Sequence, residues 1–131
     1  MRLLALGLGA GVLLWLPVED QGIHKALFFA AGSCAWAATW MLVSVSPRER
    51  GFFWRHLLTA SLAGLLVSPL TVGLMLIKSG SHAHSTPDFS LAQMQAVFLR
   101  TPFWMGGGFL LGLGAATWRM AGYNSAADKD R

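Results

Sequence analysis

Charged residues are scarce in this sequence, and their scarcity excludes an ordinary water-soluble domain. Asp, Glu, Lys and Arg make up 12% of the 131 residues, whereas soluble domains contain about 25%. Apolar residues reach 54%, and the mean hydropathy is +0.51. The few charges gather in short polar stretches between long uncharged runs, which is the distribution that a lipid bilayer imposes.

Cysteine is almost absent. Cys34 is the only one, so the sequence has no disulfide framework and no paired thiol. The net charge of +4 and the pI near 10.0 could indicate nucleic acid, but the basic residues flank apolar runs and form no patch with interleaved aromatics. Anionic lipid headgroups explain them better. We therefore expect contact with a lipid bilayer and no nucleic acid.

Motifs for catalysis and for cofactors are missing as well. The sequence shows no nucleophile beside a base, no phosphate-binding glycine loop and no pair of carboxylates within its apolar segments. A haem held by two histidines needs them at matching depth on facing spans, whereas His24 and His56 stand at opposite ends of consecutive spans. We expect no enzymatic activity and no cofactor.

Four apolar segments reach or approach the length that crosses a bilayer, which is about 20 residues. The predicted spans cover residues 2–18, 26–45, 55–77 and 101–120. The first is the shortest and resembles the apolar centre of a signal peptide, but no small-x-small cleavage site follows it. We favour a retained anchor; its removal would leave three spans.

Short connections join the first three spans, which favours antiparallel neighbours in one bundle. We therefore predict an all-α polytopic membrane protein whose four transmembrane helices form a single domain, residues 1–121. A polar tail at 122–131 is expected to be disordered and cytoplasmic.

Basic residues predict the orientation, because loops rich in Lys and Arg stay in the cytoplasm. With the N-terminus inside, seven basic residues fall on the cytoplasmic side and three fall outside. The inner group is Arg2, Arg48, Arg50, Arg55, Arg119, Lys129 and Arg131, and the outer group is Lys25, Lys78 and Arg100. Both termini are therefore predicted inside, in a bacterial inner membrane.

The longest connection covers residues 79–100 on the predicted outer side. Its first part is rich in Ser, Gly and His and predicts a flexible loop. Ser90 and Gln93 have the spacing of a capping box, and apolar residues follow at helical intervals. We predict a short interfacial helix from Ser90 to Arg100.

Small residues recur four positions apart along the spans, a spacing that lets membrane helices approach closely. They are Gly7 and Gly11 in the first span, Ala60, Gly64 and Ser68 in the third, and Gly108 and Gly112 in the fourth. Two interpretations stay open: the stripes pack the helices of this chain together, or one stripe docks another subunit.

Two further features predict bends. Gly106 and Gly107 begin a run of three glycines, each costing about 1 kcal/mol relative to alanine in a helix. Pro69 removes a backbone hydrogen bond from the third span. Both places are candidate hinges.

His82 and His84 are the candidate metal ligands. Two imidazoles spaced i and i+2 in an outer loop could hold copper or zinc, with His24 as a third ligand. The alternative to a metal site is a chance pair of histidines in a flexible polar loop, since two ligands are a weak signal.

The preferred functional hypothesis is a non-enzymatic subunit, anchor or assembly partner of a larger membrane complex, such as secretion, conjugation, respiratory or transport machinery. It rests on an uncharged bundle with many small-residue faces and little mass outside the membrane. The alternative is a small homo-oligomeric channel or transporter, with a pore near Pro69 and the glycines from 106 to 114 and polar walls from Ser61, Thr71 and Thr117. Metal binding by His82 and His84 is the weaker alternative.

Overall fold

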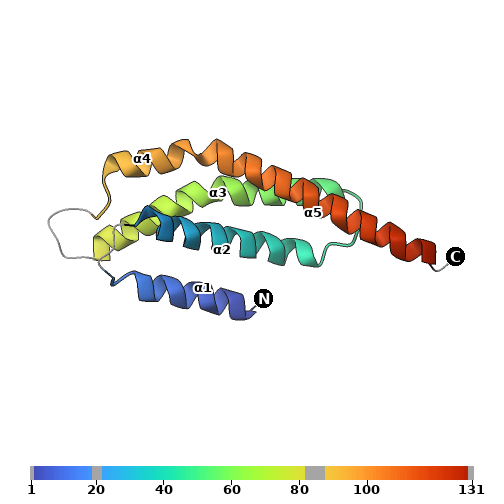
Figure 1. Cartoon of the computed structure of the whole chain (residues 1–131), viewed down its shortest axis with the longest axis horizontal. Helices are drawn as coiled ribbons and strands as arrows, with labels where there is room; N and C mark the ends of the chain where they lie inside the picture. The colour runs from blue at the N-terminus through green and yellow to red at the C-terminus, as the bar shows by residue number, and fades with distance from the viewer. Residues whose placement is uncertain (1, 19–21, 82–87, 130–131) are drawn as a thin grey trace.

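A computed structural model describes residues 2–18, 22–81 and 88–129 and shows only helices among them. The helices are α1 (Arg2–Trp15), α2 (Ile23–Val43), α3 (Phe52–Ser81), α4 (Leu91–Leu99) and α5 (Thr101–Lys129). Four of them run side by side along the long axis of the molecule, and α4 leads into α5 at one end (Figure 1). The all-α prediction is confirmed.

Three helical stretches are long and apolar enough to cross a membrane, as expected of a multi-pass membrane protein. They are Ile23–Val43, Phe52–Ser81 and the combined α4–α5 stretch Leu91–Ser125, with mean hydropathies of 1.6, 2.0 and 1.2. Helix α1 has 14 residues and is therefore about 21 Å long, shorter than the roughly 30 Å of a bilayer core. Its length alone does not make it a fourth span.

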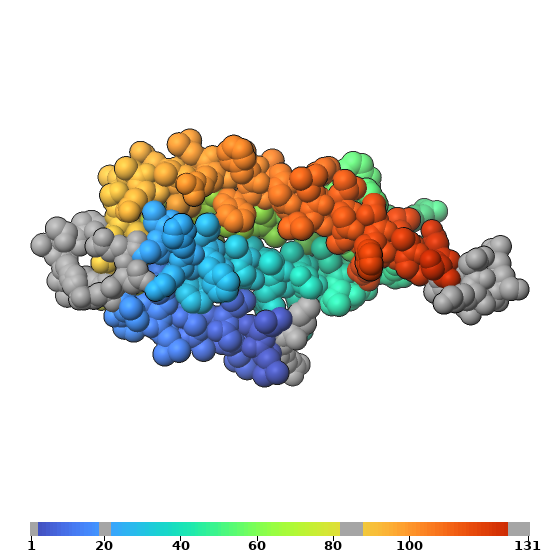
Figure 2. Space-filling view, in the orientation of Figure 1, coloured from blue at the N-terminus to red at the C-terminus, as the bar shows by residue number. Residues whose placement is uncertain are grey.

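Helix α3 is the centre of the bundle. It packs against α2 and against α5, whereas the backbones of α2 and α5 do not approach each other within the described part of the chain. Buried residues make up 39% of the apolar stretch of α3, against 17% in α2 and 17% in the α4–α5 stretch. Helix α1 lies against α2, so that α2 is visible between α1 and α5 on the face shown in Figure 2.

Glycines bring α3 and α5 into backbone contact. A Cβ atom at Gly64 would collide with the carbonyl oxygen of Trp104, and one at Gly108 would collide with that of Ala60. At Gly112 it would lie 2.6 Å from the carbonyl oxygen of His56. Because no side chain fits at these places, the two helices approach as closely as small-residue stripes permit.

The short helix after the long connection starts where the sequence predicts. The Ser90 hydroxyl accepts a hydrogen bond from the Gln93 amide at 3.3 Å, and the Gln93 side-chain oxygen accepts one from the Ser90 amide at 2.7 Å. This reciprocal pair is a capping box. The predicted cap and the helix of α4 are confirmed.

Two helices are longer than predicted. Helix α3 reaches Ser81 and includes Pro69 in its interior, so it extends into the connection that was predicted as a loop. Helix α5 continues to Lys129, and the prediction of a disordered tail is wrong for residues 122–129. Tyr123 explains part of this extension, because its hydroxyl receives a hydrogen bond from Arg48 and its ring lies 5.1 Å from the Arg48 guanidinium.

Candidate functional site

Two lateral grooves flank α2. The first, which we call the α1–α3 groove, lies between α1 and α3 and has a volume of about 850 Å³. Its lining is apolar, with small residues from all three helices: Ala5 and Gly9 of α1, Ser33 and Ala37 of α2, and Ala63 of α3. Small side chains along three helices leave room for another chain to approach closely.

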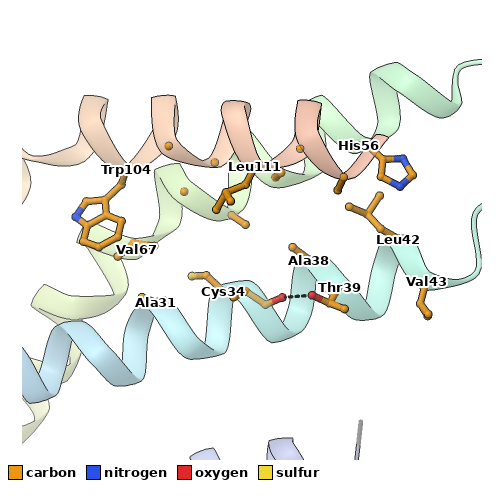
Figure 3. A pocket seen from close by; sticks show the side chains of 18 of the residues that line it. Ala31, Cys34, Ala38, Thr39, Leu42, Val43, His56, Val67, Trp104 and Leu111 are labelled. Atoms are coloured by element: carbon orange, nitrogen blue, oxygen red, sulfur yellow. Dashed lines mark hydrogen bonds between the residues drawn. The ribbon is translucent and has the colours of Figure 1, made fainter. Parts of the chain in front are cut away.

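The second groove, the α2–α5 groove, lies between α2 and α5 and has a volume of about 590 Å³. Trp104 lies at one end and His56 at the other, with Ala31, Cys34 and Ala38 of α2 on the facing wall (Figure 3). Cys34, Ala38 and Ala63 line both grooves, so the contact between α2 and α3 separates them.

A cation closes the His56 end of the α2–α5 groove. The Arg119 guanidinium of α5 donates hydrogen bonds to the carbonyl oxygens of Leu42 at 2.8 Å and Val45 at 2.9 Å. Leu42 lies in the last turn of α2 and Val45 lies two residues beyond its end, where the helix dipole favours positive charge. Arg119 thereby ties α5 to the end of α2, whose backbone does not approach that of α5 in the described part of the chain.

His56 is fully buried beside this arginine, with 1% of its surface exposed. Its Nδ1 lies 2.9 Å from the Phe52 carbonyl oxygen, which can only accept a hydrogen bond, so Nδ1 carries the proton. Its Nε2 lies 3.2 Å from an Arg119 nitrogen and accepts from it. The neighbours therefore fix one neutral tautomer of His56.

A second cation, which is buried, lies at the opposite end of the bundle. The Lys78 ammonium donates to the Trp15 carbonyl at 3.2 Å and to the Val18 carbonyl at 2.6 Å. It also lies 4.3 Å from the centre of the Trp15 ring, a cation–π geometry. Lys78 is completely buried, and it holds the C-terminal end of α1 as Arg119 holds that of α2.

Arg119, His56 and Lys78 were not among the site residues predicted from the sequence. His56 and Lys78 each stand one residue outside the charge-free run from 57 to 77, and Lys78 was assigned to the flanking basic residues. Helical spacing was the available signal. His56 lies four residues before Ala60 and in line with Gly64 and Ser68, and Lys78 continues the buried face of Thr71 and Met75.

The predicted small-residue stripes have different neighbours in the structure. Ala60, Gly64, Gly108 and Gly112 meet between α3 and α5, and Ser68 is buried in α3. A Cβ atom at Gly11 would lie 2.7 Å from the Phe29 ring of α2, and Gly7 has nothing within 4 Å. Gly7 is therefore an open position on α1.

The candidate hinge and pore residues do not gather around one path. Pro69 lines the α1–α3 groove and Gly107 lines the α2–α5 groove, whereas Gly106 lines neither. Thr71 and Thr117 donate to carbonyls of their own helices, Thr71 to Val67 and Thr117 to Leu113 and Gly114. Their hydroxyls thus have local partners.

The candidate metal ligands His82 and His84 lie outside the described residues. His24 is exposed near the start of α2. Within the ranges that the structure covers, no group of three or more His, Cys, Asp or Glu side chains could hold a metal ion.

Comparisons with known proteins do not assign the chain to a family. The chain matches no protein-family model, and neither the curated proteins nor the solved structures contain a significant match to it. The two grooves, the half-buried Arg119 and the buried Lys78 are therefore the features that bear on function.

Proposed function

We propose that this chain is a non-enzymatic subunit or anchor of a larger membrane complex, and that the α1–α3 groove receives a transmembrane helix of the partner. One observation carries the proposal: among the described residues the backbone of α1 approaches only that of α2. Trp15 and Lys78 join α1 to α3 at one end, and a groove of about 850 Å³ is open along the rest of its length.

The lining of the groove suits a helix. Association between helices in a membrane depends on close packing and on hydrogen bonds between polar side chains, because lipid supplies no hydrophobic drive. Ala5, Gly9 and Ala37 permit the close approach, and the hydroxyls of Ser33 and Thr59 offer polar partners. A partner helix in this position would also shield α1, whose Leu6 and Leu13 are 69% and 70% exposed.

We further propose that α1 is the fourth membrane-embedded helix and that both termini lie on the cytoplasmic side of a bacterial inner membrane. The short length of α1 is compatible with embedding when a partner covers it, since apolar helices shorter than the bilayer adapt by oligomerising. The excess of Lys and Arg at the end of the bundle that holds the α2–α3 connection supports the orientation.

The experiment uses a matched pair of glycines on α1. Gly9 lines the groove and Gly7 does not, and neither has an atom within 4 Å of the position of a Cβ. The full-length chain, tagged at its C-terminus, is purified from its native membrane in mild detergent, and its stoichiometric partners are identified by mass spectrometry.

A foreign subunit is expected to copurify with the wild type and with Gly7→Leu, and to be lost from Gly9→Leu. A monomer without partners would refute the subunit proposal. A homo-oligomer without foreign subunits would also contradict it and would favour a small channel. Loss of the partner from Gly7→Leu alone would assign docking to the opposite face of α1.

A further inference from the structure

Within the described part of the chain, Arg119 forms no ion pair with a carboxylate. Its three hydrogen-bond acceptors are the carbonyl oxygens of Leu42 and Val45 and the neutral Nε2 of His56. Among the described residues the ion pair at this end of the bundle joins Arg55 to Glu49 and does not include Arg119. Among these residues the positive charge of the guanidinium is therefore not paired with a carboxylate, and it lies at the end of an apolar groove.

The Arg119 guanidinium has further N–H donors that these three acceptors do not use. A guanidinium has five N–H donors in a fixed plane, and the three acceptors use three of them. Arg119 is half-buried and is itself part of the groove lining. Because its bonds to the end of α2 hold the plane in place, little conformational entropy is lost when a further anion binds.

The groove that leads away from Arg119 suits a hydrocarbon chain. Along α5 it extends from Trp104 to Arg119, about 22 Å at 1.5 Å per residue, which exceeds the roughly 15 Å of one leaflet of the bilayer core. Its volume of about 590 Å³ lies within the range of roughly 300–1,000 Å³ typical of small-molecule sites. Its walls are mostly alanine and glycine, which makes them smooth.

Charge complementarity identifies the occupant. Arg48, Arg50 and Arg55 lie at the same end of the bundle as Arg119, in the α2–α3 connection and the first turn of α3. Such clusters of basic residues beside membrane helices attract anionic headgroups. A molecule with a phosphate at one end and an apolar chain at the other matches both the cation and the groove.

We propose that Arg119 and the α2–α5 groove form a binding site for one anionic phospholipid, with the phosphate on the guanidinium and an acyl chain between α2 and α5. The site is separate from the α1–α3 groove, and it does not depend on the subunit proposal. Bound lipid would fill the α2–α5 groove, which α3 also lines.

Native mass spectrometry of the full chain in mild detergent tests the site. The protein is titrated with phosphatidylglycerol or with phosphatidylcholine of the same acyl chains. We expect the wild type to retain one phosphatidylglycerol about tenfold more tightly than phosphatidylcholine, and Arg119→Gln to lose this preference. Arg100→Gln, which removes an exposed charge next to the opposite end of α5, is the control and is expected to keep it.

A second pair of variants keeps Arg119 and its bonds intact. Gly107 lines the groove and Gly106 does not, and both have open space at the Cβ position. Gly107→Leu is expected to reduce lipid retention several-fold, whereas Gly106→Leu is expected to behave as the wild type. This pair decides the question if Arg119→Gln fails to fold.

Four outcomes would overturn the proposal. Equal retention of the two lipids by the wild type would remove the role of the anion, and unchanged retention in Gly107→Leu would remove the groove. Full competition by glycerol 3-phosphate would assign the site to a free anion. A second copy of the chain, or a stoichiometric foreign subunit, that is lost from Gly107→Leu would assign the groove to a protein.

Discussion

The Lys78 ammonium lies 2.6 Å from the carbonyl oxygen of Val18, although 60 residues separate them in the chain. This contact joins the C-terminal end of α3 to the residues that follow α1, and Lys78 also donates to the Trp15 carbonyl, which accepts from the Val18 amide as well. Arg119 makes the equivalent contact with the end of α2 at the other end of the bundle. Each cation thus binds carbonyl groups at the end of a helix whose backbone does not approach that of its own helix in the described part of the chain.

Replacement of Lys78 by methionine should loosen α1. The side chain keeps a similar volume, but the Trp15 and Val18 carbonyls lose the charged donor Lys78, and Trp15 keeps only the Val18 amide. Loss of a hydrogen bond from a charged group costs about 1.5–3 kcal/mol. Cys34, the only cysteine, is 8% exposed and lies on α2 between the two grooves. We expect its reaction with a maleimide in detergent to become several-fold faster in Lys78→Met. Lys25→Met, which changes an exposed lysine of α2, is the control, and equal rates in the two variants would contradict the capping role.

Replacement of Gly108 by alanine should separate α3 from α5. The added methyl group meets the backbone carbonyl of Ala60, and such overpacking costs about 1–3 kcal/mol. Thermal unfolding in detergent, followed by circular dichroism, measures the loss. Gly114→Ala is the matched control because its Cβ position is open, and helix propensity alone should make it slightly stabilising. A Gly108→Ala protein as stable as Gly114→Ala would show that the two helices do not touch there.

Replacement of Ser90 by alanine should fray the start of α4. The change removes the acceptor of the Gln93 amide, and the loss of such a cap costs about 0.5–2 kcal/mol. Hydrogen exchange of the amides from Leu91 to Leu99 should become faster, with little change in α2. Ser90→Asp retains an acceptor and should restore protection. If the aspartate variant exchanges as fast as the alanine variant, the cap does not determine where α4 begins.

The orientation can be tested with single cysteines in a Cys34→Ser background. Arg50 in the α2–α3 connection and Gln95 in α4 are exposed, and α4 and that connection lie at opposite ends of the bundle (Figure 1). With the N-terminus inside, Gln95→Cys should react with a membrane-impermeant maleimide in intact cells, and Arg50→Cys should react only after permeabilisation. The reverse pattern would place both termini outside.

The sequence by itself determined the class of fold. A long charge-free run of one segment can satisfy its own backbone groups in a membrane as a helix. The sequence therefore predicted helices for the apolar parts of α2, α3 and α5. The capping box of Ser90 and Gln93 is a local interaction within four residues, so the pattern was sufficient to find the start of α4. The small residues Gly64 and Gly108 were also visible, but their spacing did not say which helix they would contact.

Only the tertiary structure decided how the charged ends are used. Lys78 follows the apolar run and looks like a flanking residue in the sequence, yet the ends of α1 and α3 meet and bury it against Trp15. Arg119 and His56 are 63 residues apart, and no local pattern links them. The same holds for the two grooves. In the described part of the chain, α2 and α5 both pack on α3 without backbone contact with each other, which leaves the α2–α5 groove, and α1 and α3 both pack on α2, which leaves the α1–α3 groove. These are relations between whole helices that periodicity along one helix does not contain.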